Sequence, residues 1–322
     1  MPSSAVRTFA DPDDYAAAIR ATSASLTITQ SGRFDAKLVR TDLHRVWMQR
    51  LSDSVARVAY FSIIAGRTSI AFSAEDGPTV ISGGFEQDSS SIVRRDGGQE
   101  YFHRTSAASC NCAMSLPQDE FASFAIAIAG RDLTSVAAAA RLTPRPAALA
   151  KLRELHAAAG HLAEYAPAVI AHPEAARGLE QALIEAMVGC LDGGEVHEDR
   201  AARRQHALIL RRFKRVVEEH SDQALYIPEL CTSIGVSERT LRVCCEEQLG
   251  MSPKRFLLLR RMCLARRALR ESAPTETTVT EIATRYGFWQ FGRFAGEYKA
   301  LFRELPSAML ARPPEERSNA SL

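Results

Sequence analysis

Few residues of this chain have the type and spacing that catalysis or metal binding requires. The strand-rich first part holds only His44 and His103, which lie far apart and form no H-x-H pair. Neither a G-x-S-x-G nucleophile motif nor a phosphate-binding glycine loop is present. Two close cysteine pairs occur without a second C-x₂-C motif to complete a zinc set, namely Cys110-x-Cys112 and Cys244-Cys245. We therefore expect no enzyme activity, no cofactor and no metal site.

The distribution of charge indicates a different chemistry, the binding of a polyanion. Residues 203–312 contain 20 Lys+Arg and 12 Asp+Glu, a formal charge of +8. Residues 1–202 contain 19 Lys+Arg and 24 Asp+Glu, a formal charge of −5. A compact basic domain attracts the phosphates of nucleic acid.

The basic region contains an internal repeat. Residues 227–253 resemble residues 279–306, and an offset of 52 aligns Gly235 with Gly287. In each copy an amphipathic helix precedes the glycine, which permits the left-handed backbone of a short turn between helices. After the glycine the offset becomes 53, and it aligns the structural prolines Pro253 and Pro306.

The second helix of each copy has a buried side and an outward side. Ser237 is the expected N-cap in the first copy, and Gln290 is a poorer counterpart in the second. The buried sides are Leu241, Cys245 and Leu249, and Phe294, Tyr298 and Phe302. The outward sides are Arg239, Arg242, Val243 and Glu246, and Gly292, Ala295, Gly296 and Lys299, flanked by Phe291 and Arg293. A helix-turn-helix unit places such an outward side in the major groove of DNA.

Residues 253–272 between the copies predict one helix that carries seven basic side chains. These side chains can contact DNA phosphates or pair with nearby acids. If the joining helix holds the two outward helices parallel and roughly 34 Å apart, one chain enters two successive major grooves.

The whole chain predicts an α+β fold. Short runs rich in β-branched and aromatic residues, the last being FASFAIAIA (121–129), indicate a β barrel or sandwich. The next helices carry an apolar stripe from Leu179 to Cys190 that either dimerises the protein or packs on the β-domain. The expected divisions are a β-rich domain at 1–132, a helical pair at 133–192, a linker at 193–204, the double helix-turn-helix at 205–311 and a flexible tail at 312–322.

No secretory signal or membrane-length apolar stretch is visible, so we expect a cytoplasmic, nucleoid-associated protein. The seven cysteines are odd in number and dispersed, which favours reduced thiols that pack as small apolar groups.

The C-terminal hundred residues resemble the AraC/XylS family of transcription regulators. The resemblance lies in LGMSPKRFL (249–257), RMCLARRAL (261–269) and IATRYGFWQFGRFAGEYKALF (282–302). It implies a DNA-binding regulator, more often an activator, that acts on promoter or operator DNA with RNA polymerase. The N-terminal part resembles, less specifically, a cupin-like regulatory half.

Transferred residue by residue, the resemblance implies base contacts in both helix-turn-helix units. An arginine bound to guanine through two hydrogen bonds discriminates by about 1–3 kcal/mol. The implied DNA-binding residues are Ser237, Arg239, Thr240 and Arg242 in the first unit and Gln290, Arg293 and Lys299 in the second.

The sequence departs from the family pattern at three places. Val243 stands where many members have arginine, and Cys244-Cys245 replaces a segment with an aromatic core residue. Arg303 stands where a helix-ending glycine is usual, as Gly250 is in the first repeat. A non-glycine residue there costs about 1 kcal/mol if the left-handed conformation is kept.

Three alternatives stay open at this point. The N-terminal half could bind a small effector or a protein partner, with Trp47, Tyr60 and Phe61 either lining a pocket or filling the core. It could instead be a cupin-like enzyme tethered to DNA. Homodimer formation through the helical pair is the third.

Overall fold

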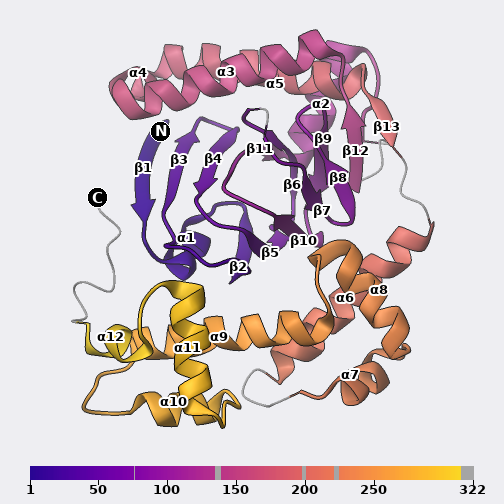
Figure 1. Ribbon diagram of the computed structural model, residues 1–322. Helices are drawn as coiled ribbons and strands as arrows, with labels where there is room; N and C mark the ends of the chain where they lie inside the picture. The colour runs from indigo at the N-terminus through magenta and orange to yellow at the C-terminus, as the bar shows by residue number, and fades with distance from the viewer. Residues whose placement is uncertain (76, 135–138, 198–200, 221–224, 313–322) are drawn as a thin grey trace.

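The computed structural model describes residues 1–75, 77–134, 139–197, 201–220 and 225–312. It has the expected α+β architecture, with a β-rich N-terminal half and a helical C-terminal half (Figure 1). No described helix combines the length and apolar character that crossing a membrane requires.

The larger of two antiparallel sheets places buried side chains of neighbouring strands in register. Met114 lies opposite Met48 on one side and opposite Ile70 on the other, and all three are buried. In spatial order the strands are β1 (Ser3–Phe9), β3 (Ala36–Asp42), β4 (Trp47–Asp53), β11 (Ser109–Pro117), β6 (Arg67–Ser73), β9 (Ile92–Asp96), β12 (Ala139–Thr143) and β13 (Glu195–His197).

The smaller sheet faces the helical C-terminal half. Its order is β2 (Thr22–Ile28), β5 (Arg57–Ile63), β10 (Glu100–Thr105), β7 (Val80–Ser82) and β8 (Phe85–Gln87). A short helix, α1 (Pro12–Ala18), joins the two sheets. The side chain of Asp11 accepts hydrogen bonds from the backbone N–H groups of Asp13 and Asp14 and so caps this helix.

Helices cover the outer face of the larger sheet (Figure 1). They are α2 (Gln118–Ala129), α3 (Pro146–Tyr165), α4 (Pro167–Ala171) and α5 (Pro173–Asp192). The apolar stripe of α5 is part of this core, since Leu183, Met187 and Cys190 are buried and Leu179 packs against them. The stripe therefore packs on the chain's own β-domain.

The prediction of a strand at 121–129 is wrong, because this segment lies in α2. Asp119 and Glu120 occupy its first turn, and Gly130 ends it in the left-handed conformation. Phe121 and Ala125 share the buried face at helical spacing, which a short apolar run does not reveal by itself.

The stretch expected as a linker is in part ordered. Within 193–204, β13 pairs with β12, and α6 begins at residue 201, while residues 198–200 lie outside the described residues. From residue 313 onward the expected tail also lies outside them.

The C-terminal half is all helical and lies against the smaller sheet (Figure 1). Phe102 of β10 packs on Phe256, with the two ring centroids 6.1 Å apart, and Leu26 and Ile28 share a core with Leu259. The helices are α6 (Ala201–Glu219), α7 (Ile227–Ile234), α8 (Glu238–Leu249), α9 (Pro253–Glu271), α10 (Val279–Arg285), α11 (Phe291–Phe302) and α12 (Pro306–Ala311).

The cysteines are free thiols, and five of the seven are buried, as expected for small apolar groups. Burial raises the pKa of the Cys112 thiol to about 12 and that of Cys244 to about 11, which keeps both protonated at neutral pH.

Candidate nucleic-acid interface

The first helix-turn-helix unit is α7 and α8. Gly235 ends α7 at φ 78° in the left-handed conformation, as the turn requires. Ser237 caps α8, and its Oγ accepts a hydrogen bond from the backbone N–H of Thr240 at 3.1 Å. Leu241, Cys245 and Leu249 are fully buried, so the opposite side of α8 faces outward.

The second unit is α10 and α11, in which Phe294 and Tyr298 are buried as expected, whereas Phe302 is half-buried and Leu301 is buried instead. Gly287 lies at φ 75° in the turn. Thr278 and Glu281 form a reciprocal capping box at the start of α10. Gln290 precedes α11 without a side-chain cap, as expected of a poorer N-cap. Beside it Trp289 is 74% exposed, which makes it an unpredicted member of this surface.

The residues expected to contact DNA lie in two groups, at the amino-terminal parts of α8 and α11, except for Lys299, which lies in the last turn of α11. All are exposed except Thr240, which is half-buried. Arg242 donates to Glu246 and Arg293 donates to Glu297, each at 2.8 Å across one helical turn. Exposed pairs of this kind are weak, so a DNA phosphate or base can displace the carboxylate.

The other ends of α8 and α11 are held by the N-terminal half. Arg104 of β10 lies so close to Gly250, at the end of α8, that a side chain there would collide with it. At the end of α11, the backbone N–H of Gly32 donates to the carbonyl of Leu301 at 3.2 Å, and the Ser31 hydroxyl donates to that of Ala300. Both outward helices therefore point their amino-terminal ends away from the β-rich half.

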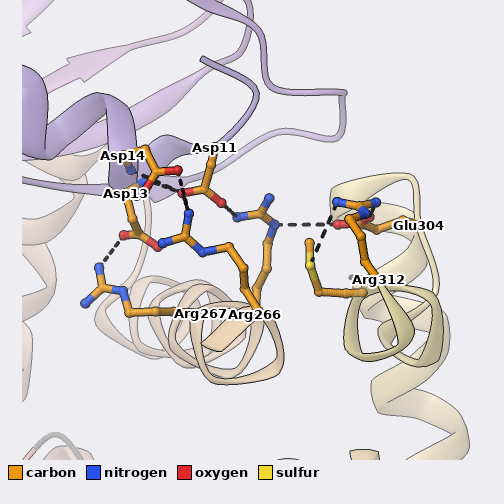
Figure 2. Close-up of polar contacts among 9 residues, drawn as sticks. Asp11, Asp13, Asp14, Arg266, Arg267, Glu304 and Arg312 are labelled. Atoms are coloured by element: carbon orange, nitrogen blue, oxygen red, sulfur yellow. Dashed lines mark hydrogen bonds and ion pairs between the residues drawn. The ribbon is translucent and has the colours of Figure 1, made fainter. Parts of the chain in front are cut away.

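The joining helix α9 is fixed to the N-terminal half by ion pairs (Figure 2). Arg266 donates to Asp11 at 2.7 Å, and both side chains are less than 10% exposed. The neighbouring pairs are Arg267 with Asp13, and Arg270 with Asp14 at 2.8 Å and with Asp11 at 2.9 Å. The sequence left two roles open for the basic side chains of α9, contact with DNA phosphates or pairing with nearby acids. Arg266, Arg267 and Arg270 pair with acids.

The acidic partners in α1 were missed in the sequence, although a signal exists. An aspartate followed by proline, as in Asp11-Pro12, is a helix-start signal. Burial lowers the pKa of Arg266, but the charges of Asp11 and Glu304 outweigh it and raise the pKa overall. The guanidinium of Arg266 therefore stays charged across the physiological range.

Comparison with known proteins agrees with this geometry. A family model described as a helix-turn-helix domain matches residues 230–312. The chain is 43% identical over 98 residues to a probable thc operon regulatory protein of Rhodococcus erythropolis, covering 30% of each chain. It is 35% identical over 103 residues to XylDLEGF operon transcriptional activator 3 of Pseudomonas putida, covering 31% of each chain. Residues 230–312 form a helix-turn-helix domain of the AraC/XylS type.

The similarity to these curated relatives spans about a third of their length. Among solved structures, a probable AraC family transcriptional regulator from Rhodopseudomonas palustris is 32% identical, with a TM-score of 0.30 over 33% of this chain and 98% of that chain.

The second repeat of the AraC-type domain differs from the first at the end of its outward helix, α11. Arg303 ends this helix at φ 61°, in the left-handed conformation that Gly250 adopts at the end of α8. The expected strain is therefore present.

The three aromatic residues considered for a pocket lie at two different places in the N-terminal half. Trp47 and Phe61 line a cavity of about 90 Å³ between the sheets, together with Gln49, Arg57 and His103. Tyr60 lies instead at the contact with the helical C-terminal half, where the ammonium of Lys214 on α6 is 4.5 Å from its ring centre. His103 is a strand residue with a hydrogen-bond partner, Arg57, as expected. Within the described ranges no three His, Cys, Asp or Glu side chains could together hold a metal ion.

A stability prediction follows from the core of the second unit. Tyr298 is fully buried and its hydroxyl has no hydrogen-bond partner among the described residues. Because an unpaired buried hydroxyl costs about 1–3 kcal/mol, Tyr298→Phe is expected to raise the free energy of unfolding by about 1 kcal/mol. Urea unfolding of both proteins measures this. A clear loss of stability in the variant would mean that the hydroxyl has a partner, such as a buried water.

Proposed function

We propose that this chain is a sequence-specific DNA-binding transcription regulator. The observation that carries the proposal is the exposure of two groups of base-reading side chains, one at each end of α9. Arg239 and Arg242 stand at the first, and Gln290 and Arg293 at the second. Placing the amino-terminal end of a recognition helix in the major groove is the docking mode of helix-turn-helix proteins.

The length of α9 supports contact with two grooves by one chain. Its 19 residues span roughly 28 Å at the helical rise. Successive major grooves on one face of DNA are roughly 34 Å apart. The outward helices α8 and α11 extend beyond the two ends of α9, so the length of α9 is compatible with this spacing. Trp289 and Phe291 add apolar surface that suits a thymine methyl group.

Regulation enters through the N-terminal half in this proposal, because that half holds the inner ends of both recognition helices. The input is a small effector or a protein partner, and the relatives named as activators favour activation with RNA polymerase. The cavity between the sheets admits only a very small molecule, since an engineered cavity of about 150 Å³ holds one benzene. We assign no catalytic step to the chain. In this proposal the protein acts on DNA in the cytoplasm. Measurement of its mass in solution tests whether it forms a dimer.

The test is selection of DNA sequences in vitro by the full chain, beside Arg239→Ala and Arg293→Ala. We expect a motif of two boxes about one helical turn apart, with each variant losing preference in one box. The loss corresponds to about 1–3 kcal/mol per arginine, or roughly 5- to 150-fold in relative affinity.

Arg177→Ala on α5 is the matched control, because this exposed arginine lies in the helical layer on the larger sheet. It should leave both boxes unchanged. Failure of the folded wild-type chain to enrich any sequence would overturn the proposal. One box that neither arginine affects would show that the base contacts are wrongly assigned.

A further inference from the structure

A second cavity lies between the N-terminal half and the end of the second helix-turn-helix unit. It measures about 500 Å³, which is within the usual range of small-molecule sites and well above the cavity between the sheets. Ala10, Pro12, Ile28, Gly32, Arg33 and Phe34 line it from the N-terminal half. From the AraC-type domain come Arg266, Phe302, Arg303, Glu304 and Arg312.

The lining of this cavity is strongly basic. Four arginines face it, against one carboxylate, Glu304. That carboxylate is already bound by Arg312 at 2.7 Å, and Arg266 is committed to Asp11. Among the described residues, the one ion pair of Arg33 is a loose and exposed contact with Asp35 at 3.7 Å. For Arg303 no ion pair is found within the described part of the chain. Among the described residues, the cavity lining therefore carries more positive than negative charge, and both halves of the chain contribute to it.

The backbone of Arg303 gives an independent indication. At φ 61° it occupies a region that costs an L-residue about 1–2 kcal/mol, and the first repeat uses glycine at the matching position. Gly250 lies against the side chain of Arg104, whereas Arg303 lines the cavity. Strained conformations of this kind concentrate at functional sites.

We propose that this cavity binds a multivalent oxyanion, a polycarboxylate or a phosphate compound, between Arg33 and Arg303. Guanidinium groups suit such ligands because their planar donors match carboxylate and phosphate oxygens in pairs. The site spans the joint at which Ser31 and Gly32 already hold the end of α11. An occupant joins the N-terminal half to the second recognition unit and stabilises their contact. This binding does not depend on whether the chain recognises DNA.

The test is calorimetric titration of the full chain with citrate and, separately, with inorganic phosphate, at constant ionic strength. We expect saturable binding at one site, and the stronger of the two probes indicates which oxyanion class the site prefers. Arg303→Gly and Arg33→Gln should each weaken binding at least tenfold. Arg303→Gly also relieves the backbone strain, so its thermal midpoint should equal or exceed that of the wild type, and loss of binding could not be attributed to misfolding.

Arg177→Gln is the matched control, since it removes one exposed arginine from α5, far from this cavity in the fold. It should bind the probe as the wild type does. The proposal is overturned if neither probe binds the wild type saturably. It is equally overturned if Arg303→Gly and Arg33→Gln bind as tightly as Arg177→Gln, because binding would then be general attraction to a basic surface.

Discussion

Replacement of Asp11 by alanine is expected to lower the free energy of unfolding by about 3–5 kcal/mol, the usual cost of removing one partner from a buried ion pair. Asp11 is 6% exposed and makes three kinds of contact at once. It caps α1, it accepts from Arg266 at 2.7 Å, and it pairs with Arg270 at 2.9 Å. Without it, Glu304 at 3.6 Å is the one carboxylate left in an ion pair with the buried guanidinium of Arg266 among the described residues.

Chemical denaturation followed by circular dichroism measures this effect, and Asp14→Ala is its matched control. Asp14 lies on the same helix and pairs with the same arginine, Arg270, but it is more exposed and caps nothing. Its loss should cost no more than about 1 kcal/mol, as for other partly exposed pairs. Equal effects of the two substitutions would mean that the contact between α1 and α9 is solvated and contributes little to stability.

The same contact shows why part of the fold could not be predicted from the sequence. Turn glycines, N-caps and buried helix positions of the repeat follow from spacing within about ten residues, and Gly235, Ser237 and Leu241 lie as expected. Asp11 and Arg266 are separated by 255 positions, and nothing local to either residue names the other. The choice between phosphate contact and internal pairing for α9 therefore needed the tertiary structure.

Segment 121–129 shows a second limit. Its apolar run is compatible with a strand or with a helix, and flanking residues decide between them. The acids at 119 and 120 and the glycine at 130 favour the helix, but the alternating isoleucines Ile126 and Ile128 imitate a strand. Both isoleucines are exposed, so the apparent alternation records no buried face.

Acidification is expected to destabilise the folded chain well before its carboxylates are protonated. Burial and the charges of Arg57 and Arg95 lower the pKa of His103 from 6.5 to about 3. Burial lowers the pKa of His156 to about 4. Below pH 6.5 the unfolded chain binds a proton on each histidine while the folded chain does not, so stability falls as the pH falls. From pH 6.5 to pH 5 each histidine removes about 2 kcal/mol.

His103→Gln isolates one of the two contributions, because the glutamine keeps a neutral acceptor near Arg57, which lies 3.3 Å from His103 Nδ1. The difference in unfolding free energy between pH 6.5 and pH 5 should shrink by about 2 kcal/mol in this variant. His44→Gln, at an exposed position, controls for removal of a histidine. An unchanged difference in His103→Gln would show that His103 is protonated in the folded chain at pH 5. A second positive charge would then lie beside Arg57, whose Nη2 is 2.7 Å from the carboxylate of Asp53.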